Sequence, residues 1–149
     1  GEGMAYMPIK GAPNLPMYPI SMIVGDVAEM EVSVVKSEYV DFENVEVAPS
    51  KGSLSRQINP EDVPYEYGEM YQQDAFYPAQ QAVLSDPYVL RDFRGQNMMV
   101  YPYAYNPVAK TLRVYTYLRI EAKKVSNNGV NPKLNRKRSN AVDSEVNAS

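Results

Sequence analysis

Two basic side chains stand alone in a long acidic stretch of this sequence, and they are the first candidates for chemistry. Between residues 37 and 90 there are ten acidic residues and only two basic ones, Lys51 and Arg56. An arginine guanidinium pairs with a carboxylate through two parallel hydrogen bonds. Arg56, flanked by Ser55 and Gln57 and with Lys51 as its basic neighbour, could therefore enter an acidic pocket of a partner. It could equally pair with a carboxylate of its own surface, because surface ion pairs are common and individually weak.

Three residue types that carry much of enzyme chemistry are missing. The chain contains no histidine, no cysteine and no tryptophan. The first two are needed for Ser-His and Cys-His catalysis and for most zinc, haem and iron–sulfur sites. We therefore expect no enzyme, no cofactor, no metal site and no disulfide in this chain.

The acidic groups Glu61-Asp62 and Glu66…Glu69 are the remaining candidates for a site. They could bind calcium or act as a general acid/base pair. They lack the regular ligand spacing and the glycine of a calcium loop, and nothing in the sequence places two carboxylates across a cleft. We expect them to be solvated loop charges.

A cluster of basic residues lies close to the C-terminal end. Its members are Lys133, Arg136, Lys137 and Arg138. Such a run could contact nucleic acid or a membrane surface, but a phosphate-binding surface needs a broad basic face, and the preceding domain is acidic. The run is more typical of a solvated linker that suits a processing protease. No stretch approaches the roughly 20 apolar residues of a membrane span, so we expect neither a nucleic-acid partner nor membrane insertion.

Alternation of apolar and polar residues predicts the elements that must position these side chains. Residues 111–122 place Leu112, Val114 and Ile120 on one face and Arg113 and Tyr115 on the other, which is typical of a half-buried antiparallel strand. The same reasoning predicts strands over residues 16–24, 28–39 and 44–48. Two more, over 88–93 and 96–105, are predicted to join across Arg94-Gly95.

Periodicity disappears between residues 49 and 81, where prolines and glycines recur. Loops longer than about 12–15 residues are uncommon in compact domains and are usually functional or disordered. Tyrosines at positions 65, 67, 71 and 77 favour an ordered loop that packs against something. Arg56 and Lys51 both lie on this loop.

Six or seven strands without a convincing helix predict an all-β fold. We expect a single antiparallel β-sandwich or jelly-roll-like domain over residues 1–125, with a long ordered loop. Residues 126–149 are rich in Asn, Ser, Lys and Arg without apolar spacing, and we expect a flexible polar linker there.

A series of short motifs makes the chain recognisable from about residue 11 to residue 121. The motifs are Ala48-Pro49-Ser50-Lys51-Gly52, Leu54-Ser55-Arg56, Asn59-Pro60 with Pro64-Tyr65, Leu84-Ser85-Asp86-Pro87, Leu90-Arg91-Asp92, Arg94-Gly95-Gln96, Tyr105-Asn106-Pro107-Val108 and Lys110-Thr111-Leu112-Arg113. In order and spacing this chain resembles the N-terminal pro-domain of the gingipain family of cysteine peptidases, and the arginine-specific members more than the lysine-specific one.

The resemblance implies an intramolecular inhibitor and folding aid. It implies a β-sandwich that lies on the cognate catalytic domain of the same precursor. It also implies that the precursor is secreted or at the outer-membrane surface after passage through the periplasm. Arg56 matches the loop arginine that plugs the primary specificity pocket until proteolytic removal. Family pro-domains carry additional β structure ahead of the position of Met4, so an N-terminal strand is expected to be missing here. The alternative is a cell-surface binding or adhesion module that uses the tyrosine-rich loop.

Overall fold

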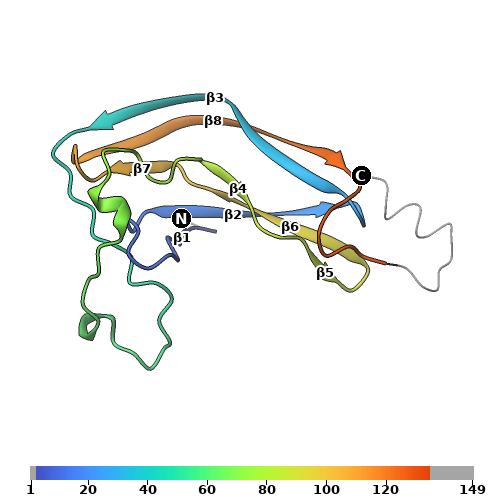
Figure 1. Ribbon diagram of the computed structural model, residues 1–149, viewed down its shortest axis with the longest axis horizontal. Helices are drawn as coiled ribbons and strands as arrows, with labels where there is room; N and C mark the ends of the chain where they lie inside the picture. Colours follow the sequence, from blue (N-terminus) through green and yellow to red (C-terminus); the bar gives the residue numbers. More distant parts are fainter. Residues whose placement is uncertain (1–2, 135–149) are drawn as a thin grey trace.

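Strands of alternating polarity form two stacked antiparallel sheets in the computed structural model, which describes residues 3–134 (Figure 1). One sheet has the order β1 (Ala5–Tyr6), β2 (Pro16–Val24), β6 (Phe93–Val100) and β4 (Ala82–Leu84), and β5 (Tyr88–Leu90) also pairs with β6. The other has the order β3 (Glu29–Phe42), β8 (Thr111–Ser126) and β7 (Tyr103–Asn106). The predicted antiparallel β-sandwich is confirmed.

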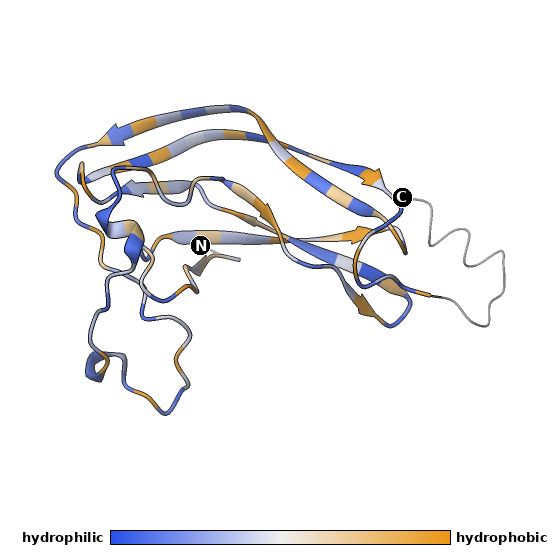
Figure 2. Cartoon of the chain, in the orientation of Figure 1, coloured by the Kyte–Doolittle hydropathy of each residue, from blue (hydrophilic) through white to orange (hydrophobic). Residues whose placement is uncertain are grey.

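The long pair β3 and β8 shows how the alternation sets the faces of a sheet (Figure 2). Val34 lies opposite Ile120, so apolar side chains share one face, as directly opposed residues do. Asp41 lies opposite Arg113 on the other face. The division of residues 111–122 into an apolar and a polar face is confirmed.

Arg113 holds the polar face of this sheet together. Its guanidinium donates two hydrogen bonds to the Asp41 carboxylate, at 2.9 and 3.0 Å. It lies between the rings of Tyr39 and Phe76, 3.9 Å from each centroid. The hydrogen bond from Arg113 lowers the pKa of Asp41 below its ordinary value.

Three sequence-based strand assignments were wrong. The single strand predicted over residues 96–105 is divided between β6 and β7, which belong to different sheets. Residues 44–48 form no strand, because their backbone bonds are single links such as Val45 N–H to the carbonyl of Lys110. Arg94-Gly95 lies inside β6, and the turn before it is at residues 91–92, where Arg91 has a φ of 55°. Gly95 suits a strand here because the Tyr88 ring covers it: a Cβ would lie 2.6 Å from that ring.

The buried core lies where the N-terminal arm meets the segment between β6 and β7. Met7, Ala12 and Tyr101 form its centre, and Met70 of the long loop packs against them. The N-terminal arm is therefore integral to the fold, and the long loop is rooted in the core.

Arg94 joins three distant parts of the chain at the opposite end of the sandwich. Its guanidinium is fully buried, and it donates hydrogen bonds of 2.6–3.0 Å to the carbonyls of Gly25, Ala28, Val130 and Asn131. Burial lowers the pKa of Arg94. The segment 127–134 after β8 is thus tied back to the β2–β3 turn.

Backbone hydrogen bonds hold the first part of the linker predicted for residues 126–149 against the domain. Gly129 N–H donates to the carbonyl of Val27 at 3.0 Å and Lys133 N–H to that of Asp26 at 2.8 Å. Residues 135–149 lie outside the described part of the chain, so the flexible linker stays a prediction there. No helix within residues 3–134 is long and apolar enough to cross a membrane.

Candidate functional site

The middle of the long loop between β3 and β4, around residue 60, projects away from both sheets (Figure 1). The loop contains two short 3-10 helices, η1 (Pro60–Asp62) and η2 (Glu69–Gln72). Asn59 caps η1, because its side-chain oxygen accepts a hydrogen bond of 3.0 Å from Glu61 N–H. Proline at the first position of η1 supplies a fixed φ that suits the turn.

Tyrosines fix both ends of the long loop. The Tyr71 hydroxyl donates to the carbonyl of Val47 at 2.6 Å, and the Tyr105 hydroxyl donates to that of Val45 at 2.6 Å. Tyr67 packs edge-on against Tyr71 with ring centroids 4.9 Å apart. Burial raises the pKa of Tyr71. The expectation of an ordered, tyrosine-packed loop agrees with these contacts.

Arg56 lies on a tight turn within the projecting part of the loop. Ile58 N–H donates to the carbonyl of Ser55 at 3.1 Å, so Arg56 and Gln57 are the central residues of the turn. All four residues from Ser55 to Ile58 are exposed. Within residues 3–134 the Arg56 side chain makes no ion pair or hydrogen bond. Self-pairing with a neighbouring carboxylate, one of the two sequence-based interpretations, is not what the structure contains.

Lys51 differs from Arg56 because its amine is engaged inside the loop. Its Nζ donates to the carbonyl of Pro60 at 2.7 Å and lies 4.5 Å from the centroid of the Tyr65 ring. The Lys51 side chain is half-buried at the foot of the loop. The structure therefore separates the four predicted site residues: Arg56, Ser55 and Gln57 share one turn, whereas Lys51 faces the loop's own interior.

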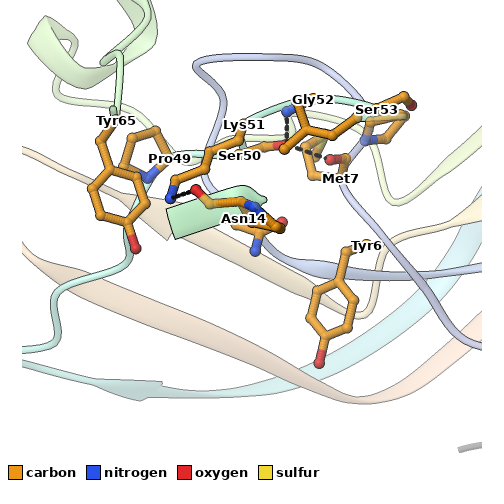
Figure 3. A pocket seen from close by; sticks show the side chains of 12 residues that line it. Tyr6, Met7, Asn14, Pro49, Ser50, Lys51, Gly52, Ser53 and Tyr65 are labelled. Carbon is orange, nitrogen blue, oxygen red and sulfur yellow. Dashed lines mark hydrogen bonds between the residues drawn. The ribbon is translucent and has the colours of Figure 1, made fainter. Parts of the chain in front are cut away.

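A cavity of about 450 Å³ opens at the foot of the loop (Figure 3). It lies between the N-terminal arm, which contributes Tyr6 and Met7, and the loop, which contributes Lys51 and Tyr65. Sequence reasoning did not find this cavity, because residues so far apart in the chain carry no local signal of their contact.

The remaining charged candidates do not assemble into a site. Among the described residues no group of three acidic side chains could hold a metal ion. Glu66 instead forms an ion pair with Lys10 of the N-terminal arm. At the C-terminal side, Lys133 is nearly buried and its Nζ lies 3.7 Å from the Asp26 carboxylate. The other three basic residues of that run lie outside the described part of the chain.

Comparisons with known proteins identify the family. The Propeptide_C25 profile matches residues 2–146. Gingipain R1 of Porphyromonas gingivalis is 43% identical over 139 residues, which is 87% of this chain and 14% of that protein. Gingipain R2 of the same species is 44% identical over 122 residues, which is 82% of this chain and 17% of that protein. The chain thus spans less than a fifth of the length of these relatives.

Solved structures agree with the sequence comparison. A chain in the complex of the pro- and mature domains of P. gingivalis RgpB matches with a TM-score of 0.81 and 38% identity, over 97% of this chain and 75% of that one. A structure on the zymogenic latency of gingipain K from P. gingivalis matches with a TM-score of 0.67 and 22% identity, over 83% of this chain and 71% of that one, and supports the fold. The chain belongs to the Propeptide_C25 family and is a non-catalytic pro-domain of the gingipain type.

Proposed function

We propose that this pro-domain keeps a gingipain-type cysteine peptidase latent, with Arg56 as the residue that plugs the primary specificity pocket. The partner is the catalytic domain of the same precursor. The observation that carries the proposal is the state of Arg56: an exposed arginine on a projecting turn, without a side-chain partner among the described residues. This chain is similar to the RgpB pro-domain, which was solved in complex with its mature domain. We therefore infer that Arg56 binds a peptidase catalytic domain.

The chemistry of the plug follows from the arginine side chain. A guanidinium that enters a pocket with a carboxylate at its base gains two parallel, charge-assisted hydrogen bonds. Ser55 and Gln57 flank Arg56 in the sequence. They would lie along the substrate-binding cleft of the peptidase, one on each side of the bond that is cleaved in a substrate. A few central residues such as this arginine carry a large share of the binding energy, and the wider interface excludes water from around them.

Release follows from the same geometry. The bond after Arg56 is in an exposed turn, so it is also the first cleavage site that an arginine-specific peptidase meets. Cleavage there breaks the loop and weakens the complex. A domain that binds only the native enzyme also stabilises it by mass action, so we extend the proposal to a role as folding aid.

The wider setting belongs to the proposal as well. We place the precursor among secreted or outer-membrane surface proteins that pass through the periplasm, as its relationship to the gingipains implies. The β-sandwich of residues 1–125 would be the inhibitor, and the polar stretch 126–149 would be a linker. Its first part is held against the β2–β3 turn, so processing cuts would follow the basic residues after Lys133. Family membership favours this role over an adhesion module.

The experiment compares three versions of the full chain against an arginine-specific peptidase of this family. Arg56→Ala is expected to raise the inhibition constant at least about 100-fold, the scale of a lost central hot-spot residue, while the melting temperature stays unchanged. Arg119→Ala removes another exposed arginine, on β8, and is expected to inhibit like the parent chain. If Arg56→Ala inhibits as strongly as Arg119→Ala, Arg56 is not the plug.

A further inference from the structure

Lys51 links the two legs of the projecting loop, which are the outgoing segment that begins at residue 51 and the returning segment over residues 60–67 (Figure 3). It lies where the chain leaves the body of the domain, and its Nζ reaches the carbonyl of Pro60 at 2.7 Å on the other leg. The amine also lies over the ring of Tyr65, 4.5 Å from its centroid, a cation–π arrangement. One side chain therefore links positions 51, 60 and 65.

The foot of each leg is anchored independently of Lys51. Ser50 is buried, its hydroxyl donates to the carbonyl of Met7 at 2.6 Å, and its backbone exchanges hydrogen bonds with Gly11 and Ala12. On the other leg, Gly68 N–H donates to the carbonyl of Gly11 at 2.9 Å. Without Lys51 the loop would be held only at these feet and by the ion pair of Glu66 with Lys10, and the stretch between residues 51 and 65 would be free to move as one arc.

The Lys51 contacts divide that stretch. They add a second closure between residues 51 and 60, so the part that carries Arg56 becomes a shorter arc. Within it, the Ser55–Ile58 hydrogen bond fixes the turn that carries Arg56, and the Asn59 cap fixes the start of η1. Ordering these residues before binding removes an entropic cost that a flexible loop meets when it docks.

We propose that Lys51 is a positioning residue of the inhibitory loop: it clasps the two legs so that the Arg56 turn meets the peptidase in one fixed geometry. This inference rests on the proposed function. A loop held in one geometry can fill the specificity pocket while its peptide bond stays poorly aligned for attack, because cleavage needs close alignment with the catalytic groups. A loop without the clasp can adapt to the cleft and becomes a better substrate and a weaker inhibitor.

The clasp also decides which basic residue of the loop is recognised. The Lys51 amine donates a hydrogen bond to Pro60 and lies over the Tyr65 ring, so it cannot enter a specificity pocket without losing both contacts. The Arg56 side chain makes no such contact with the described residues. The bond after Lys51 is therefore protected, and the bond after Arg56 is the one presented.

The test measures inhibition and cleavage together on the full chain. Lys51→Met keeps the length of the side chain and removes its charge and donors. We expect it to raise the inhibition constant for an arginine-specific peptidase about 10-fold and to speed cleavage after Arg56 by a similar factor, the scale of one charged hydrogen bond. Its melting temperature should stay close to that of the parent chain, since the feet of the loop are anchored separately.

Rescue separates positioning from general damage. Lys51→Arg keeps a cation that can donate to the Pro60 carbonyl and stack on Tyr65, and it is expected to restore both inhibition and resistance to cleavage. Unchanged inhibition and cleavage in Lys51→Met would overturn the inference. So would a Lys51→Arg chain that behaves like Lys51→Met.

A second assay does not depend on inhibition. A lysine-specific endopeptidase should cut the parent chain after Lys51 slowly, and Tyr65→Leu, which removes the aromatic face, should accelerate that cut. Rapid cutting of the parent chain after Lys51 would overturn the inference that Lys51 links the two legs of the loop, even if the domain inhibits the peptidase. Slow cutting in a chain that fails to inhibit leaves the clasp intact and refutes the proposed function instead.

Discussion

Replacing Arg94 by methionine should cost a large part of the stability of this domain. The guanidinium is fully buried and donates to four carbonyl oxygens, two from the β2–β3 turn and two from the segment after β8. Methionine has a similar length, so Arg94→Met removes the donors while it keeps much of the volume. The four oxygens are left without this partner.

The size of the effect follows from two opposing contributions. Four hydrogen bonds to a charged donor, at about 1.5–3 kcal/mol each, sum to roughly 6–12 kcal/mol. Removing the buried charge recovers its desolvation cost of several kcal/mol, and the two oxygens after β8 can regain water when that segment detaches. We therefore expect a net loss of about 3 kcal/mol in the free energy of unfolding, against a total of roughly 5–15 kcal/mol for a domain.

Urea unfolding measures this loss directly. With a slope of about 1–3 kcal/mol/M, 3 kcal/mol lowers the unfolding midpoint by about 1–3 M. Hydrogen exchange locates the damage: the amides of Gly129 and Lys133, which donate to Val27 and Asp26, should lose protection first. Arg119→Met, at an exposed arginine, is the control and should stay within about 0.5 kcal/mol of the parent chain. An Arg94→Met chain within 1 kcal/mol of the parent, with both amides still protected, would refute the reasoning.

Two further perturbations test other parts of the fold. Gly129→Ala should destabilise the domain by about 1–3 kcal/mol in urea unfolding, because a Cβ there would lie 2.9 Å from the carbonyl carbon of Ala28; an unchanged midpoint would show that the segment after β8 is free to shift. Asp41→Asn should reduce stability at neutral pH and flatten its decline in acid. Because the hydrogen bond from Arg113 lowers the pKa of Asp41, its stabilisation is present above the ordinary value of about 4 and is lost as pH falls through the lowered one; parallel pH profiles of the two chains would contradict this.

Alternation alone predicted the framework of the fold. The period of two along residues 111–122 and 28–39 identified the two longest strands and the side chains that share a face. The burial expected for one face of residues 28–39 was wrong, because β3 is exposed along most of its length. Alternation failed where elements are short or where contacts are distant. β4 has only three residues, and the 44–48 stretch alternates without a partner strand at its side.

The Arg94-Gly95 pair shows the limit more clearly. In the sequence, the glycine between two apolar stretches favours a turn. In the fold, Gly95 leaves room for the Tyr88 ring, and Arg94 supplies the donors that four distant carbonyls lack. Both reasons depend on residues that only the folded chain brings together.

The candidate site was predictable in part. Acidic surroundings singled out Lys51 and Arg56, and the family resemblance favoured Arg56. Sequence could not separate their roles, because the difference lies in Pro60 and Tyr65, which reach Lys51 and leave Arg56 exposed.

The measurement that tests the central claim most directly is a titration of the full chain against an arginine-specific peptidase of the gingipain type, with a small arginyl substrate as the reporter. The account predicts tight, saturable inhibition that competes with the substrate, followed by slow cleavage of the chain after Arg56. An enzyme that keeps its full rate at a large excess of the chain would contradict the account.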